Sequence, residues 1–206
     1  MSANMTVAGL LRPCGKKLAV LYDVAVVVGG SLIIALCAQL AIGWPVPVTG
    51  QTFAVLMIGA LLGARRASVS VLTYIMAGAA GLPVFAHGRS GFTVLSGPTG
   101  GYLFGFVFAV YMVGLLAERG WDRRIGTTIL AMIFGNLVIY AFGLLWLYCL
   151  VFMDKLAISS NKILTMGLYP FIPGDLLKIA LAAILLPSGW KLLGSLNLPA
   201  KEYKHH

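Results

Sequence analysis

Residues 18–42 read LAVLYDVAVVVGGSLIIALCAQLAI, and Asp23 is the only charged residue in this run. A helix needs about 20 apolar residues to cross the hydrocarbon core of a bilayer, so the run is long enough to span. It is also much longer than the roughly 7–15 apolar residues of a secretory signal peptide. We therefore expect residues 18–42 to form a first transmembrane helix that is retained.

The composition of the whole chain extends this expectation. Of the 206 residues, 60% are hydrophobic and 10% are charged, and the mean hydropathy is +0.95. A soluble domain carries about 25% charged residues, so water is a poor solvent for most of this surface. No stretch is long and polar enough to fold separately in water, which favours a single all-α integral membrane domain in contact with the lipid bilayer.

Five more apolar segments follow along the chain, namely residues 53–63, 67–86, 101–117, 125–152 and 173–186, the last with an extension towards residue 193. We therefore expect six transmembrane helices. The second segment is short, so it spans only if part of the Pro45-Val-Pro47 segment lies at membrane depth. Longer connections rich in Gly, Pro, Ser and Thr are expected at residues 43–52, 87–100 and 153–172.

Basic residues are concentrated on one of the two sides of this arrangement. Eleven of the fifteen lie at the termini or in the short turns: Arg12, Lys16, Lys17, Arg65, Arg66, Arg119, Arg123, Arg124, Lys191, Lys201 and Lys204. By the positive-inside rule these regions are cytoplasmic, and the three long connections face outward. The same rule accounts for the net charge of +9 and the pI of about 9.7 without nucleic acid as a partner.

The expected organisation is then a cytoplasmic N-terminal segment at residues 1–17, a six-helix bundle at 18–193 and a cytoplasmic tail at 194–206. His205 and His206 resemble the start of an expression tag. The multi-pass topology leads us to expect a protein of the cell membrane.

Asp175 and Lys178 are the strongest candidates for a ligand site. Ionisable residues inside a span are costly and usually mark a functional position. Two residues at i and i+3 share one helix face, so this pair should face the protein interior. Pro173 suits a first helical turn, which places the pair near the outer helix end, where N–H groups favour an anion. The alternative is an ion pair that only fixes packing.

Three further side chains are candidates from their position. Arg89 is the basic residue of the Gly-flanked segment Gly88–Gly91; it either clamps an anion or faces water. Asn136, in the middle of a span, either bonds a neighbouring helix or contacts a polar ligand group. Tyr102, like Tyr140 and Trp146, either lines a pocket or anchors at the interface.

Other chemistries find little support. The sequence has no G-x-x-x-x-G-K-[ST] loop and no H-E-x-x-H motif. Its three cysteines form no CxxC, and His87 is the only histidine before the terminal pair, so we expect no metal site and no cofactor. If the chain moves a solute, its energy comes from a partner. An intramembrane enzyme using Asp175 as its acid would lack a second carboxylate at matching depth.

Four stretches resemble the BioY family, the biotin-specific S components of energy-coupling factor (ECF) transporters. They are PVPVTGQTF at 45–53, GAAGLPVFA at 78–86, LSGPTGGYLFGF at 95–106 and PFIPGDLLK at 170–178. The resemblance covers nearly the whole chain after the first twenty residues. Residues 153–168 depart from it, because they are longer and more polar than the family pattern.

The resemblance implies a six-helix S-component fold that binds biotin near the outer face. It also implies partners, a membrane T subunit and two ATP-binding-cassette ATPases. Asp175 and Lys178 match the family's biotin-contacting pair. Arg89 falls in a loop that supplies a ligand contact, and Thr49 and Gln51 fall in the loop that resembles a lid. An S component for another vitamin is the alternative within transport.

Overall fold

The computed structural model describes residues 5–43, 46–153, 156 and 162–195, and most of them are helical. The long helices are α2 (Lys16–Gln39), α3 (Gln51–Leu62), α4 (Ala64–Ala79), α6 (Gly100–Glu118), α7 (Ile125–Phe152) and α9 (Ile172–Ser195). The short helices are α1 (Val7–Leu11), α5 (Phe92–Ser96) and α8 (Ile163–Gly167), with 3-10 turns η1 (Ala86–Gly88) and η2 (Trp121–Arg123). Two short strands, β1 (Ala41–Ile42) and β2 (Val48–Thr49), pair antiparallel.

The six long helices correspond one to one to the six expected segments, and the fifth has the expected bounds. Four stretches are long and apolar enough to span a membrane: Lys16–Gln39, Gly100–Glu118, Ile125–Phe152 and Ile163–Ser195. Helices α3 and α4 have 12 and 16 residues. At about 1.5 Å per residue neither covers the roughly 30 Å of hydrocarbon alone.

The expected end of the third segment at Ala86 is wrong. Helix α4 ends at Ala79, because Gly81 adopts a left-handed φ of +106° and Pro83 follows two residues later. The first helix likewise ends at Gln39, and Ala41 and Ile42 turn into β1, where they face Thr49 and Val48. The expected outer connections also contain the short helices α5 and α8.

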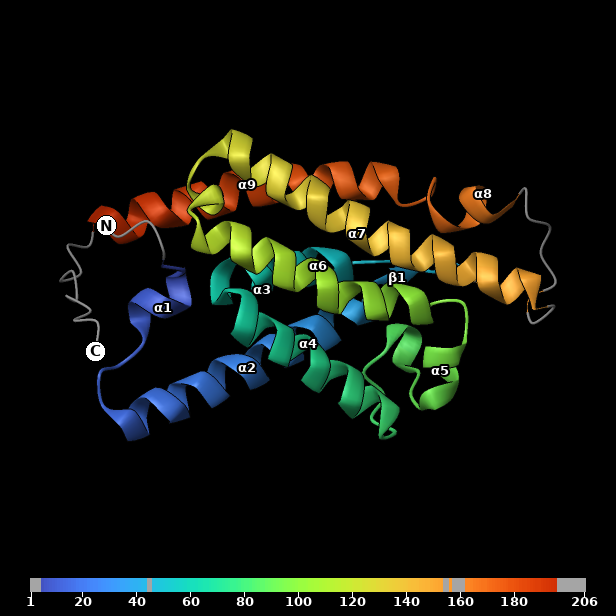
Figure 1. The fold of residues 1–206 in the computed structure, drawn as a ribbon, viewed down its shortest axis with the longest axis horizontal. Coiled ribbons are helices and arrows are strands. Elements are labelled where there is room, and N and C mark those ends of the chain that lie inside the picture. The colour runs from blue at the N-terminus through green and yellow to red at the C-terminus, as the bar shows by residue number, and fades with distance from the viewer. Residues whose placement is uncertain (1–4, 44–45, 154–155, 157–161, 196–206) are drawn as a thin grey trace.

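The long helices run along the length of the molecule (Figure 1). Helix α1 and the C-terminal end of α9 lie at one end, and α5 and α8 lie at the other. Helix α6 is central and packs against α7, α3 and α4, whereas α2 packs mainly on α4. The strands lie beside the long helices, between the middle of the molecule and the end that holds α5 and α8 (Figure 1).

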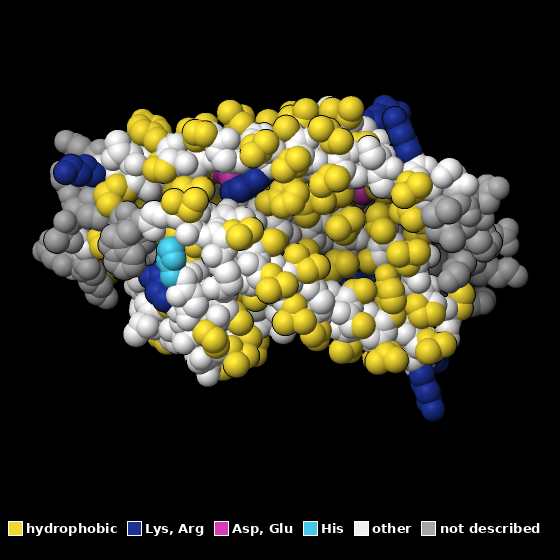
Figure 2. Space-filling view, turned by 180° about the vertical axis from the view of Figure 1, so that it is seen from behind, with side chains coloured by type: hydrophobic (Ala, Val, Ile, Leu, Met, Phe, Trp, Pro, Cys, Tyr) yellow, Lys and Arg dark blue, Asp and Glu magenta, His cyan; other side chains and the backbone are white. Residues whose placement is uncertain are grey.

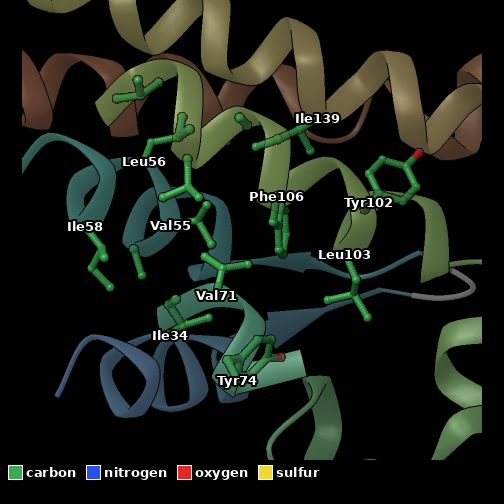
Figure 3. Close-up of a cluster of buried hydrophobic side chains, with 14 of the residues drawn as sticks. Ile34, Val55, Leu56, Ile58, Val71, Tyr74, Tyr102, Leu103, Phe106 and Ile139 are labelled. Carbon is green, nitrogen blue, oxygen red and sulfur yellow. The ribbon is translucent and has the colours of Figure 1, made fainter. Parts of the chain in front are cut away.

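Burial differs sharply between the helices. Of the apolar window of α6, 61% is buried, against 17% for α2. The core is a cluster of aliphatic and aromatic side chains between α3, α4, α6 and α7, including Val55, Val71, Phe106 and Ile139 (Figure 3). Hydrophobic side chains also spread over the outer surface, and most Lys and Arg side chains in that view lie towards its two ends (Figure 2). This distribution suits a surface that lies in lipid.

The turn between α6 and α7 holds a buried carboxylate. Asp122 is 2% exposed, and its Oδ2 accepts a hydrogen bond from the indole N–H of Trp190 on α9. Its Oδ1 has no hydrogen-bond partner among the described residues. Burial raises the pKa of Asp122, although the Trp190 hydrogen bond and the Arg123 charge act in the opposite direction.

We expect Asp122→Asn to raise the thermal unfolding midpoint by a few degrees at neutral pH. A raised carboxyl pKa means that the stability contributed by the protonated form is lost as pH rises through the folded-state value. The amide keeps an oxygen for Trp190 and carries no charge. The unfolding midpoints of the wild type and the variant should therefore differ at neutral pH. They should agree more closely at about pH 4, near the ordinary Asp pKa. A lower midpoint at neutral pH would mean that the charge itself stabilises the turn through Arg123.

Candidate functional site

A cavity of about 520 Å³, open mouth included, lies between α3, α4, α6, α7, the β1–β2 segment and the segment that precedes α5. Most of its wall is aromatic or aliphatic. Its polar side chains are Thr49, Gln51, Thr52, Arg89 and Thr99, together with the hydroxyls of Tyr74, Tyr102 and Tyr140.

The aromatic residues of the wall hold one another in place. Tyr74 and Phe85 meet edge to face with ring centroids 5.5 Å apart. Phe171 stacks on Tyr102 at 6.0 Å and meets Tyr140 edge to face at 6.2 Å. Such fixed ring faces suit an apolar, ring-shaped ligand. Tyr74, Tyr102 and Phe106 come from α4 and α6, which cross beside the strands (Figure 3).

Several polar groups of the wall are already engaged. The side-chain amide of Gln51 donates to the hydroxyl of Tyr74 at 2.8 Å, and the Gln51 backbone N–H donates to Thr49 Oγ1 at 3.2 Å. The hydroxyl of Tyr102 donates to the carbonyl of Gly167 at 2.7 Å. Tyr102 therefore offers the cavity its ring more than its hydroxyl.

Asp175 and Lys178 lie at the start of α9, behind the wall of the cavity. Lys178 Nζ donates to Asp175 Oδ1 at 2.9 Å, to Thr52 Oγ1 at 2.8 Å and to the Thr49 carbonyl at 2.8 Å. Tyr140 donates its hydroxyl to Asp175 Oδ2. Asp175 is 4% exposed. The pair is thus internally neutral, and it reaches the cavity through the lining residues Thr49, Thr52 and Tyr140.

Asn136 does not line this cavity. It faces a smaller one of about 190 Å³ between α3, α7 and α9, which is also lined by Thr52, Met132 and Lys178. Asn136 Oδ1 is buried and has no hydrogen-bond partner among the residues that the structure describes. Lys178 and Thr52 therefore stand between the two cavities.

Arg89 lines the main cavity from the segment that follows α4. Its Nε donates to the carbonyl of Ala86 at 3.2 Å, and its own carbonyl accepts from the backbone N–H of Phe85 at 3.0 Å. Between them His87 adopts a left-handed φ of +60°, which is uncommon outside glycine. Among the described lining residues of the main cavity, Arg89 is the one with a cationic side chain.

The structure thus brings Thr49, Gln51, Arg89 and Tyr102 together, places Asp175 and Lys178 one layer behind them, and separates Asn136. The sequence did not single out Thr52, Tyr74, Phe85, Thr99 or Phe171. A signal existed for four of them, because Thr52, Phe85, Thr99 and Phe171 lie within the four stretches quoted from the sequence. Nothing local marked Tyr74, because it sits in the middle of a helix.

Comparisons with known proteins identify the family of this chain. A model of the BioY family matches residues 7–195. The biotin transporter BioY of Rhizobium etli is 37% identical over 148 residues, which cover 68% of this chain and 76% of that protein. Its namesake from Thermotoga maritima is 39% identical over 145 residues, with coverages of 68% and 79%.

A solved structure is also similar. The crystal structure of the S-component for biotin from an ECF-type ABC transporter superposes with a TM-score of 0.70 and 26% sequence identity. The similarity covers 87% of this chain and 95% of the solved one. The fold is therefore that of an S component.

Proposed function

The chain belongs to the BioY family of multi-pass membrane proteins, and from that membership we propose that it captures biotin as the substrate-binding subunit of an ECF transporter. The observation that carries the proposal is the cavity. Its wall is mostly aromatic or aliphatic, Arg89 is the cationic side chain among its described lining residues, and it backs onto the Asp175–Lys178 ion pair. Family members are transporter subunits, so the enzyme alternative is set aside.

Biotin combines a neutral bicyclic ureido ring system with a carboxylate on a flexible chain. The ring faces of the stacked pair Tyr102 and Phe171, with Tyr140 edge to face against Phe171, suit the bicycle. A ureido group both donates and accepts hydrogen bonds, and so does the layer formed by Thr52, Asp175 and Lys178. This match supports binding of the ring system at the α9 side of the cavity.

The carboxylate pairs with Arg89 in this proposal. All three N–H groups of Lys178 already have acceptors, and Asp175 compensates its charge. Arg89 presents a planar fork that matches a carboxylate. Thr49 and Gln51 then belong to the lid over the ring. Asn136 acts indirectly, through the second cavity and Lys178.

We further propose that both termini are cytoplasmic, as the distribution of basic residues indicates, and that the cavity opens outward. Uptake then needs a membrane T subunit and two ATP-binding-cassette ATPases, because the chain itself contains no P-loop. Residues 1–17 and 194–206 flank the six-helix bundle on the cytoplasmic side; residues 1–4 and 196–206 lie outside the described part.

The test is equilibrium binding of labelled biotin to the purified chain in detergent. We expect tight binding that is displaced by unlabelled biotin and by desthiobiotin, but not by thiamine or riboflavin. Biotin methyl ester, which lacks the anion, should compete roughly ten- to a hundredfold less well, the loss of about 1.5–3 kcal/mol that a charged hydrogen bond provides.

The controls separate two failures. If a folded, monodisperse sample binds no biotin, the proposed ligand is wrong, and a screen of other vitamins follows. If biotin binds and its methyl ester competes equally well, the ligand stands and the role of Arg89 is wrong.

A further inference from the structure

The last turn of α2 is bonded to both segments that cover the cavity, although none of the described lining residues belongs to α2. The backbone N–H of Gly50 donates to the carbonyl of Leu40 at 3.1 Å, directly beside the β1–β2 segment. On the other side, Gln39 bonds to residues 84–91, which we call the Arg89 loop.

Gln39 bonds the Arg89 loop with both ends of its amide. Its Nε2 lies 3.3 Å from the carbonyl oxygens of Val84 and Phe85, and its Oε1 accepts from the N–H of Gly88 at 3.0 Å. The same Nε2 lies 3.2 Å from the carbonyl of Ala35 on its own helix. One side chain thus ties the end of α2 to three backbone groups of the loop.

The Arg89 loop needs such external support. Its backbone is irregular, and His87 holds a left-handed conformation that a non-glycine residue seldom adopts. The buried ring of Phe85 fixes one end of the loop against α4, since a Cβ on Gly78 would lie 2.2 Å from it. The loop also contacts the helices through its hydrogen bonds to Gln39 of α2.

We propose that Gln39 is a positioning residue that holds Arg89 over the cavity and ties the cavity's closure to the position of α2. This inference rests on the proposed function for its ligand. Helix α2 is the least buried of the candidate spans, with 17% of its apolar window inside the molecule. Gln39 thus links an exposed helix to the loop that carries the cation.

The first arm of the test needs no ligand. Hydrogen exchange of peptides covering residues 84–91 is compared in the full-length wild type, Gln39→Met and Leu36→Met. Leu36 is exposed on the same helix and serves as a matched control. Gln39→Met should accelerate exchange in this segment, at Gly88 above all, and Leu36→Met should not. Equal exchange in all three proteins would overturn the proposal.

The second arm is a double-mutant cycle on labelled-biotin affinity with Gln39→Met and Arg89→Gln. Gln39→Met should weaken binding about tenfold in the wild type, the value of roughly one net hydrogen bond, and by less than about twofold in the Arg89→Gln background. Gln39→Glu keeps the acceptor for Gly88 and should be intermediate. Additive losses would show that Gln39 does not act through Arg89. Absence of biotin binding by the wild type would refute the proposed function, while the exchange arm still decides the positioning role.

Discussion

Lys178→Met is expected to lower biotin affinity at least a hundredfold and to lower the unfolding midpoint by about 10 °C. The ammonium makes three hydrogen bonds, to Asp175, Thr52 and the Thr49 carbonyl. Without the ammonium, the buried carboxylate of Asp175 accepts hydrogen bonds only from hydroxyl groups. Breaking a buried pair costs about 3–5 kcal/mol, and each kcal/mol shifts the midpoint by roughly 2–4 °C in a chain of this size.

Binding suffers for a second reason. The Thr49 carbonyl and Thr52 hydroxyl belong to the cavity wall, and Lys178 fixes both of them. Without Lys178, the Thr49 carbonyl in the lid segment and the Thr52 hydroxyl beside the ligand lose the hydrogen-bond donor that holds both of them. Affinity is measured with labelled biotin and stability by thermal unfolding in the same detergent.

The matched control is Asp175→Asn combined with Lys178→Met, which removes both charges together. The double variant should regain most of the lost stability, because no uncompensated charge stays buried. It should still bind poorly. If it binds like the wild type, the pair serves packing alone, which is the alternative that the sequence left open.

The sequence predicts the features of the fold that depend on local patterns and misses those that depend on contacts between segments. Apolar runs and basic turns located six helices, because both signals are local. They did not predict the end of α4 or the β1–β2 pair. Ala41 pairs with Thr49 across a turn, and that pairing depends on backbone contacts that no hydropathy pattern records.

The same distinction separates the site residues that the sequence identified from those that were hard to assign. Arg89 was singled out because a basic residue in an outer loop of a membrane protein is conspicuous, whereas Thr49 and Gln51 came from the resemblance to the BioY family. Asn136 and Tyr140 were harder to assign, because α7 is apolar on all sides and its rotation cannot be derived from the pattern. They lie one turn apart on one face, yet Tyr140 lines the main cavity and Asn136 the smaller one. Only the packing of α3 and α9 separates them.

Gly101→Val is expected to destabilise the chain by about 3 kcal/mol, the upper end of the range for overpacking. Gly101 sits where α6 crosses α7. A Cβ there would lie 2.2 Å from Trp146 Cβ and 2.7 Å from the carbonyl oxygen of Phe142, so the backbone itself must move. Small residues at such crossings allow membrane helices to approach closely. Thermal unfolding in detergent measures the loss.

The same change should weaken biotin binding, because the crossing positions the cavity wall. Trp146 donates its indole N–H to the carbonyl of Gly97 at 2.9 Å, just ahead of the lining residues Thr99 and Tyr102. Gly29→Val is the control: a Cβ at Gly29 on α2 has no atom within 4 Å, and a substitution without new contacts should stay within about 0.5 kcal/mol. Similar losses in both variants would mean that valine disturbs any helix of this protein, and that the crossing of α6 and α7 has no special role in holding the cavity open.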